Sequence, residues 1–577
     1  MIRSIKPLAW GLAGAFMLAA CDATELEENL VNPNEPNPEV ASIEFVFNGL
    51  QLNFEDFLGG ANEGPGDDLP GFTGRAVGAY ERLMPLTRQL ALQAGNRYDN
   101  AFQPVNFDFP WRKAYAEALP DAQLVKATAR ASGQEIAAGI ALVYEAMTYL
   151  TLVDMFGDVP FSEFGQGITI QNPVADPGNV IYDAMLDSLD VAIAILSDES
   201  STGEVSNDLI YGGSPEAWVA AANTIKLKAL LNLRLVDEAR ATSGISAILE
   251  SGEYINDMSL DWAFPYSDVR SSFDSRHTLY SNSYETGAAG YIGNSFMFDL
   301  LTDYDTRDPR LRYYVYRQDV DATDEDFFTL SCQALPAPAQ YGPDQPFCTA
   351  LPEEGYWGRD HGDDSGIPPD DLKRTIVGVY PAGGAFDDGS AQEIGDDQGA
   401  GGGRGAGILP VMLTPYVEFM RAEAALTLGT EDGDARALFL QAVESSIRSV
   451  HGYSANIVTI PDEFASVTSD GELSEQAASY LEDVGEAYDD AGNDDERLNL
   501  IGREYYKALW TNGLEAYNLY RRTGAPNDFQ PTIEPVSGDF PRLLLYPNDA
   551  ATLNSSIQQR DIAEQVFWDT NPAGFIN

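Results

Sequence analysis

Apolar residues recur along this chain with the period of an α-helix, and short turn signals separate the helical stretches. The clearest stripe has spacings of four and three positions and consists of Ile136, Ile140, Val143, Met147 and Leu150. Gly157 and Pro160 follow it and predict the end of the helix. Because such a stripe buries one face of a helix against a neighbour, the pattern favours a fold built from packed helices.

Three further helices are predicted from their first residues. Ser214 precedes Pro215, and Thr414 precedes Pro415. A hydroxyl that caps the helix, followed by proline at its first position, is typical of a helix start. Asp434 can cap a partner helix after the second of these, since only a short Gly-containing turn lies between the two. Helices joined by such short turns pack as hairpins.

A last helix is predicted near the C-terminus, ended by Gly524 and Pro526. Its stripe runs through Tyr506, Leu509, Gly513, Ala516 and Tyr520. Paired helices with alanine at close-packing positions predict an all-α-dominated fold: a tetratricopeptide-like scaffold of stacked helical repeats, with long irregular loops and minor β content. An irregular all-α fold without repeats would show the same periodicity.

Residues 255–405 differ from this scaffold in composition. They are rich in Gly, Pro, Asp and Tyr, which predicts long loops with a few short helices and strands. Loops of this length between scaffold helices are usually functional or mobile. We therefore expect one domain over residues 39–577, with a helical scaffold at 39–254 and 406–530 and a loop-rich, ligand-facing insert at 255–405.

The first twenty residues have the features of an export signal. Arg3 and Lys6 precede a mostly apolar run over 8–20, which is too short to span a bilayer. The run ends in Leu-Ala-Ala-Cys, which resembles the lipobox at which bacterial lipoproteins are cut and then lipidated on cysteine. We predict a lipoprotein signal peptide at 1–20, lipidation of Cys21 and an acidic, Pro-rich tether at 21–38. The alternative is an ordinary signal peptide with an incidental cysteine.

The charge balance excludes a common class of partner. The chain of 577 residues has 34 Lys and Arg against 90 Asp and Glu, a formal charge of −56. Such a chain would be repelled by nucleic acid, which is bound through clustered cations. The three histidines, His277, His361 and His451, are too few for a typical His-based metal or catalytic site. We predict neither a metal nor a cofactor, and contact with the membrane only through the lipid.

Two cysteines remain in the body of the chain. Cys332 and Cys348 enclose 15 residues rich in Pro and Gln. Export to an oxidising compartment permits a disulfide, which would restrain this loop by roughly 3 kcal/mol. A metal site is the weaker alternative, because two thiols do not complete a zinc shell.

Several motifs, in order along the chain, resemble those of the SusD/RagB family of outer-membrane lipoproteins. The most specific are FGDVP at 156–160, MRAEAAL at 420–426 and RRTGAP at 521–526. The resemblance extends over most of the mature chain, and WGRDHGDDSGIPPD at 357–370 is similar to a variant branch of the family. The charged residues of these motifs, such as Glu418, Glu423, Arg521 and Arg522, are predicted to join helices rather than to touch ligand.

The resemblance implies the role of a lid over a SusC-type TonB-dependent transporter. Family members bind oligosaccharides or peptides at the cell surface and pass them inward without catalysis. The resemblance therefore implies an outer-membrane, lipid-anchored protein that faces the cell exterior. The resemblance also implies that the protein binds an oligosaccharide or another oligomeric nutrient and delivers it to the transporter.

A sugar-binding site needs an aromatic platform beside polar side chains. Two regions outside the helical stripes supply that mixture: the segment before Trp111 and the insert. The predicted ligand-binding residues are Tyr98, Asp99, Asn100, Phe102, Trp262, Tyr266, Tyr280, Tyr284 and Trp357. Trp111, Trp218 and Trp510 lie in predicted helices and are assigned to the core.

Two other functions are compatible with composition and periodicity. One is a secreted glycan-active enzyme, such as an acidic glycoside hydrolase, because carboxylate pairs are abundant. The other is a helical-repeat scaffold that binds only proteins. The family resemblance favours the non-catalytic nutrient-binding lipoprotein.

Overall fold

The computed structural model describes most of the chain from Ser42 onward. Its described residues are 42–62, 76–92, 97–270, 274–280, 290–320, 336–343, 345–348, 350–351, 354–363, 374–387, 401–430 and 433–576. The predicted signal peptide, Cys21 and the tether lie outside these residues.

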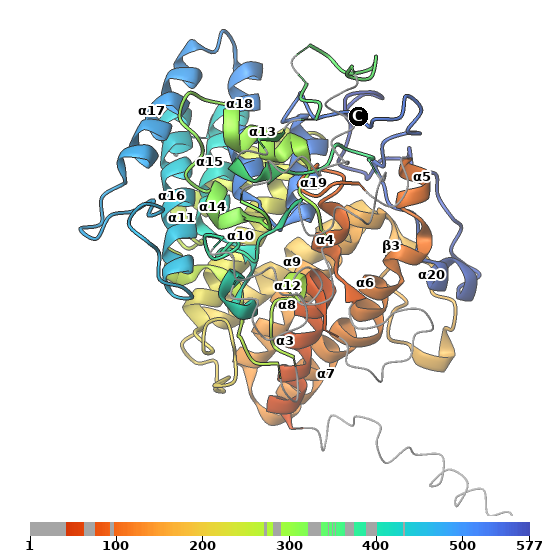
Figure 1. Ribbon diagram of the computed structural model, residues 1–577. Coiled ribbons are helices and arrows are strands. Elements are labelled where there is room, and N and C mark those ends of the chain that lie inside the picture. Colours follow the sequence, from red (N-terminus) through yellow and green to blue (C-terminus); the bar gives the residue numbers. More distant parts are fainter. Residues whose placement is uncertain are drawn as a thin grey trace, which may run out of the picture.

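Helices make up most of the described structure, and this confirms the all-α fold class (Figure 1). The α-helices are α3 (Ile43–Gly59), α4 (Ala79–Leu83), α5 (Tyr98–Ala101), α6 (Asp108–Arg112), α7 (Leu119–Ser132), α8 (Glu135–Phe156), α9 (Gly178–Leu196), α10 (Pro215–Leu233), α11 (Glu238–Ser251), α12 (Thr278–Tyr280), α13 (Asn294–Thr302), α14 (Leu311–Tyr314), α15 (Thr414–Leu428), α16 (Ala435–Ala455), α17 (Glu475–Asp490), α18 (Asp494–Ala508), α19 (Gly513–Thr523) and α20 (Asn548–Leu553). Shorter turns are the 3₁₀ helices η1 (Pro104–Phe107), η3 (Gly167–Thr169), η4 (Met258–Leu260) and η9 (Gly401–Gly405) and the π-helix η2 (Lys113–Ala118).

The strands are few and pair two by two in antiparallel fashion. The pairs are β1 (Gly60–Ala61) with β2 (Ala76–Val77), β3 (Val159–Pro160) with β4 (Ala175–Asp176), β5 (Trp262–Tyr266) with β10 (Gly407–Met412), β6 (Val315–Arg317) with β9 (Thr375–Val377), and β7 (Ala350–Leu351) with β8 (Tyr356–Trp357). The β5–β10 pair closes the segment 255–405 at its base, because it joins one end of that segment to the other. This agrees with the minor β content expected there.

The long helices form one continuous packed array. Neighbours in the sequence pack against each other from α7 to α11, and α10 and α11 in turn pack against α15. Helices α15 to α18 then form a group of their own, which lies at one side of the molecule in Figure 1. This stacking of sequential helix pairs is the arrangement of tetratricopeptide-like scaffolds.

Helix α8 is the centre of the core. It is buried on nearly all sides and ends at Gly157, whose φ of 75° suits glycine. It is also the one helix, in the part of the chain that the structure describes, that is long and apolar enough to cross a membrane. Since 83% of its most apolar stretch is buried inside the protein, it is a core helix.

The predicted helix starts are largely confirmed. The hydroxyl of Ser214 accepts a hydrogen bond from the backbone of Ala217, and Asp434 caps α16 in the same way. The prediction for Thr414 is wrong by one residue, because Thr414 is already the first residue of α15. Its backbone N–H and its hydroxyl both donate to Asp261, at 2.6 and 2.7 Å. The cap of α15 therefore comes from a carboxylate about 150 residues away in sequence.

The single helix predicted over 506–520 is wrong, since the chain breaks it into α18 and α19. Thr511 takes a φ of 70°, and the side chain of Asn512 accepts from the backbone of Glu515 to start α19. Gly513 lies against α4, where an added Cβ would come within 2.3 Å of the Tyr80 carbonyl oxygen. Trp510 belongs to this turn rather than to a helix. It is fully buried, as is Trp218, and Trp111 is buried in the same core.

Charged side chains join helices inside the core, as predicted for the family motifs. Arg522 of α19 donates two hydrogen bonds to Glu423 of α15, at 2.8 and 2.9 Å, and Arg234 reaches the same carboxylate. Burial alone would raise the pKa of Glu423, but the two guanidinium groups hold it below its usual value. The pairing fixes how α15 and α19 lie against the end of α10.

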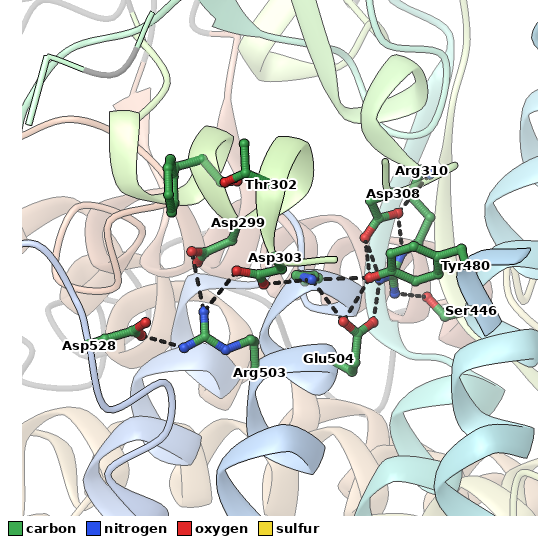
Figure 2. Close-up of polar contacts among 12 residues, drawn as sticks. Asp299, Thr302, Asp303, Asp308, Arg310, Ser446, Tyr480, Arg503, Glu504 and Asp528 are labelled. Atoms are coloured by element: carbon green, nitrogen blue, oxygen red, sulfur yellow. Dashed lines mark hydrogen bonds and ion pairs between the residues drawn. The ribbon is translucent and has the colours of Figure 1, made fainter. Parts of the chain in front are cut away.

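A second buried network ties the region around α13 and α14 to α18 (Figure 2). Arg310, in the turn before α14, contacts Asp308 and Glu504, each at 2.6 Å. Arg503 of α18 contacts Asp299 of α13 at 3.4 Å. The loop-rich segment is therefore held to the helical scaffold by buried charges as well as by apolar packing.

Candidate functional site

An open pocket of about 470 Å³ lies where Arg88 and Tyr98 meet the C-terminal part of the chain. We call it the aromatic pocket. Its walls come from α5, from the insert and from the last sixty residues of the chain. Its lining residues include Arg88, Tyr98, Gln340, Gln345, Tyr520, Asn527, Phe529, Glu534, Ser537, Asp539, Phe540, Arg542, Gln565 and Ile576.

Backbone contacts hold the start of α5 against the C-terminal segment. The N–H of Tyr98 donates to the carbonyl of Ser537 at 2.9 Å, and Arg97 donates to the carbonyl of Val536 at 3.0 Å. Arg97 also forms a two-fold hydrogen bond with Asp99. These contacts place the ring of Tyr98 at the pocket wall.

Aromatic rings form the floor of the pocket. Tyr98 meets Phe540 edge to face at 5.5 Å, and Tyr520 lies 4.6 Å from Phe529 and 5.6 Å from Phe540. The guanidinium of Arg88 lies over Phe529 and Phe540, at 5.1 and 5.7 Å from the ring centroids. Each ring is at least nine-tenths buried, so the pocket is lined by ring edges on a rigid base.

Three polar side chains connect this floor with the protein interior. Arg88 donates to the hydroxyl of Tyr98 at 3.2 Å, and that hydroxyl lies 3.1 Å from Nε2 of His361. Burial raises the pKa of Tyr98, and burial together with the cation of Arg88 lowers the pKa of His361 well below its usual value. At neutral pH the tyrosine is therefore protonated and the histidine is neutral.

Amide side chains complete the walls. Gln340 and Gln345 donate to backbone carbonyls of the segment 529–533, and thereby hold that segment in place. Gln565 donates to two carbonyls through Nε2, which leaves its Oε1 as an acceptor. The side-chain amide of Asn527 is exposed and has no partner among the described residues. Two walls thus offer amide groups to a ligand.

Two other pockets have a different character. The larger, of about 760 Å³, lies beside the loop after α16 and has no Phe, Tyr or Trp in its lining. The smaller, of about 180 Å³, is lined by Arg82, Phe102, Asn106 and mostly apolar side chains. We call it the Arg82 pocket. Of the three, the aromatic pocket alone combines several rings with amide groups.

The structure separates the predicted ligand-binding residues at α5. Tyr98 lines the aromatic pocket, and Phe102 lines the Arg82 pocket. Asp99 and Asn100 are exposed next to them, with Asp99 held by Arg97. Two of the four residues thus line concave surface, and the ligand-binding role of the segment stays a prediction.

The insert aromatics do not form an open platform, and the prediction is corrected for three of them. Trp262 is 1% exposed and stacks on Phe54 at 5.5 Å inside the core. Trp357 is 1% exposed beneath the guanidinium of Arg374, and Tyr280 is 2% exposed. Unlike Tyr98, these three rings line neither the aromatic pocket nor the two other pockets described above.

The remaining predicted residues are placed differently. Tyr266, on β5, is partly buried and donates its hydroxyl to Glu55. Tyr284 and Cys332 lie outside the described residues. Cys348 is disulfide-bonded, and its pairing with Cys332 stays a prediction. Within the described ranges, no group of three His, Cys, Asp or Glu side chains is arranged to hold a metal ion.

Sequence reasoning missed most of the aromatic pocket. Its rings and amides lie at the end of α19 or after it: Tyr520, Asn527, Phe529, Phe540 and Gln565. The mixture of aromatic and amide residues that singled out the segment before Trp111 is also present at 520–540. This mixture is therefore a signal in the sequence by which the segment 520–540 can be recognised.

Comparisons with known proteins agree with the motifs. The family model described as "Starch-binding associating with outer membrane" matches residues 77–329, and that described as "Susd and RagB outer membrane lipoprotein" matches residues 409–563. Among curated proteins, none matches the sequence.

Solved structures with the same fold cover the chain almost completely. A SusD homologue from Bacteroides fragilis has a TM-score of 0.64 at 15% identity, and a SusD/RagB family protein from Bacteroides thetaiotaomicron has 0.61 at 17%. A chitin-binding protein has 0.61 at 19%. In all three cases 92% of this chain and 100% of the other chain are covered. The chain belongs to the SusD/RagB family of nutrient-binding outer-membrane proteins.

Proposed function

We propose that this protein binds an oligosaccharide in the aromatic pocket and delivers it to a SusC-type TonB-dependent transporter. In this proposal a lipid on Cys21 anchors it to the outer membrane, and the body of the protein faces the cell exterior. The observation that carries the proposal is the aromatic pocket itself, in which ring edges and free amides share one concave surface. Sugars offer C–H faces to rings and hydroxyls to amides, so this is a surface that suits them.

The family, rather than the side chains of the pocket, favours binding over catalysis. The amides of Asn527 and Gln565 form hydrogen bonds but do not transfer protons at neutral pH, and burial holds Tyr98 and His361 neutral. The lining also includes two exposed carboxylates, Glu534 and Asp539, so hydrolysis has to be tested by looking for products. The family is one of binding proteins, which favours nutrient binding over a glycoside hydrolase or a purely protein-binding scaffold.

Calorimetry on residues 22–577, which lack the lipidated cysteine, tests the binding step. We would titrate chito-, malto- and other oligosaccharides and analyse the same samples for products. Chito-oligosaccharides are included because one structural relative is a chitin-binding protein. Saturable binding without product is expected. Product formation, or no binding to any glycan, would overturn the proposal.

Variants of the free amides locate the site. Asn527→Ala and Gln565→Ala should each weaken binding by about two- to tenfold, the value of one neutral hydrogen bond. Asn256→Ala, an exposed amide after α11 and outside the pocket, serves as the matched control and should leave the affinity unchanged. Equal affinity of all three variants would place the glycan elsewhere.

Delivery requires a partner in the same membrane. The full-length protein, solubilised from cells in mild detergent, should copurify with a TonB-dependent transporter. A Cys21→Ala variant should lose membrane attachment, and intact cells should expose the wild-type protein to added protease. If the protein purifies without any transporter, the delivery step is contradicted, while the binding result is unaffected.

A further inference from the structure

The Arg82 pocket lies close to the aromatic pocket but shares no lining residue with it. Its volume of about 180 Å³ is near the size of one amino-acid residue. The walls come from α4, from the turn that follows it and from the segment 101–107. They are largely apolar and include Val77, Pro85, Leu90, Leu92, Phe102 and Phe107.

The cation in this pocket is unpaired in the structure. Among the described residues, no carboxylate lies within ion-pairing distance of Arg82, and its side chain donates no hydrogen bond. Its Nε is fully buried without an acceptor. Burial lowers the pKa of Arg82 to about 10, and no neighbouring charge opposes that effect.

This absence is unusual for the molecule. Other buried guanidinium groups have acceptors: Arg310 and Arg522 pair with carboxylates, and Arg521 donates to two backbone carbonyls and to Asn518. A partly buried cation without a partner costs free energy. An anion that enters the pocket would remove that cost, so the site favours a negatively charged group.

A second polar side chain in the pocket, Asn106, also has an unsatisfied hydrogen-bonding atom. Asn106 donates through Nδ2 to the carbonyl of Ala101 at 2.7 Å, and its Oδ1 accepts no hydrogen bond from the described residues. The pocket therefore offers one cation, one free acceptor and largely apolar walls, and the carboxylate of Glu81 also belongs to its lining. The C-terminal residue of a peptide has the matching groups: a carboxylate, an amide N–H and a side chain.

We propose that the Arg82 pocket binds the C-terminal residue of a peptide whose last side chain is apolar. The carboxylate pairs with Arg82, the last amide N–H donates to Asn106 Oδ1, and the side chain packs against Phe102 and Phe107. A uronic acid would also supply a carboxylate, but its hydroxyls would face apolar walls without partners. The proposal does not depend on the ligand of the aromatic pocket.

Calorimetry with a matched pair of small probes tests the proposal. N-acetyl-leucine carries the free carboxylate, and N-acetyl-leucinamide has nearly the same shape without the charge. On residues 22–577 the acid should bind at least tenfold more tightly than the amide, because charge-assisted hydrogen bonds are the stronger kind. Equal affinity of the two probes, or no binding of the acid, would overturn the proposal.

Variants of two adjacent residues of the pocket lining test whether the positive charge of Arg82 is needed for binding. Arg82→Gln should reduce binding of N-acetyl-leucine by about tenfold or more. Glu81→Gln removes a negative charge from the same pocket lining and should leave binding unchanged or tighten it. If Arg82→Gln does not fold, the affinities of the wild-type protein for N-acetyl-leucine and N-acetyl-leucinamide still test the proposal. Preference for glucuronate over N-acetyl-leucine would replace the peptide with an acidic glycan and so refute the assignment.

Discussion

The guanidinium of Arg310 and the carboxylate of Glu504 lie 2.6 Å apart, and neither side chain is exposed to solvent. Lys507, one turn further along α18, donates to the same carboxylate at 2.8 Å, and the hydroxyl of Tyr480 donates to it at 2.7 Å (Figure 2). Burial alone would raise the pKa of Glu504, but Lys507 and Arg310 lower it below its usual value. A single ionised side chain thus connects α14, α17 and α18.

Removal of this carboxylate charge should destabilise the protein strongly. Glu504→Gln leaves Arg310 and Lys507 buried with less negative charge, and the expected loss in the free energy of unfolding is about 3–5 kcal/mol. Chemical denaturation followed by circular dichroism measures it. Arg307→Gln, which breaks an exposed pair with Glu354, is the control and should cost less than about 1 kcal/mol. Similar losses for both variants would contradict the argument.

Asp261 should make stability depend on pH. Burial raises its pKa to about 7, against hydrogen bonds from Thr414 and Tyr453 that lower it. The folded state therefore holds this proton between about pH 4 and 7, where the unfolded state has lost it. The contribution of Asp261 to stability is complete below pH 4 and is lost as the pH rises through 7.

Asp261→Asn removes that dependence. The free energy of unfolding of the variant, minus that of the wild type, should increase by up to about 4 kcal/mol between pH 4 and 7.5. Denaturation curves at several pH values on both proteins give this difference. Asp257→Asn, an exposed carboxylate nearby, should show no such rise. A constant difference across the range would show that Asp261 ionises normally.

Gly513 should not tolerate a side chain. An added Cβ would meet the Tyr80 carbonyl oxygen at 2.3 Å and the Met84 nitrogen at 2.5 Å, and both are backbone atoms that cannot move alone. Gly513→Ala should lower the melting temperature much more than Gly252→Ala does. Gly252 has a φ of 69° but open space around it, so its replacement costs only about 1 kcal/mol. Equal shifts would mean that α4 and α19 can separate without loss.

Tyr98→Phe should weaken the floor of the aromatic pocket. The variant leaves Nε2 of His361 and one N–H group of Arg88 without the shared hydroxyl, at a cost of about 1–3 kcal/mol. Thermal unfolding measures this cost. Tyr546→Phe is the control. It also removes a buried tyrosine hydroxyl, which donates to the Asp158 carbonyl outside the pocket. If only Tyr98→Phe also lowers glycan affinity, the floor supports the ligand site.

The helical scaffold could be predicted from the sequence because its signals are local. The stripe from Ile136 to Leu150, the cap at Ser214 and the stop at Gly157 each depend on residues within a few positions, and all three are confirmed. The break between α18 and α19 could not be predicted in this way. It arises because Gly513 packs against Tyr80, more than 400 residues away in sequence, and the apolar stripe continues through it unchanged.

The site was less predictable for the same reason. Trp262 and Trp357 have neighbours typical of ligand platforms in sequence, but distant partners such as Phe54 and Arg374 cover their faces. Only burial in three dimensions separates a core ring from an exposed one. Nor could the sequence show that Arg82 has no partner among the described residues, because a chain with 90 acidic residues offers many candidates.

The aromatic pocket joins walls that are far apart in sequence, from Arg88 and Tyr98 on one side to Ile576 on the other. Because the ribosome makes the chain from its N-terminus, the pocket cannot assemble before its C-terminal wall has been synthesised. A truncated product that lacks this wall would lose the binding site proposed for the pocket even if its helices folded.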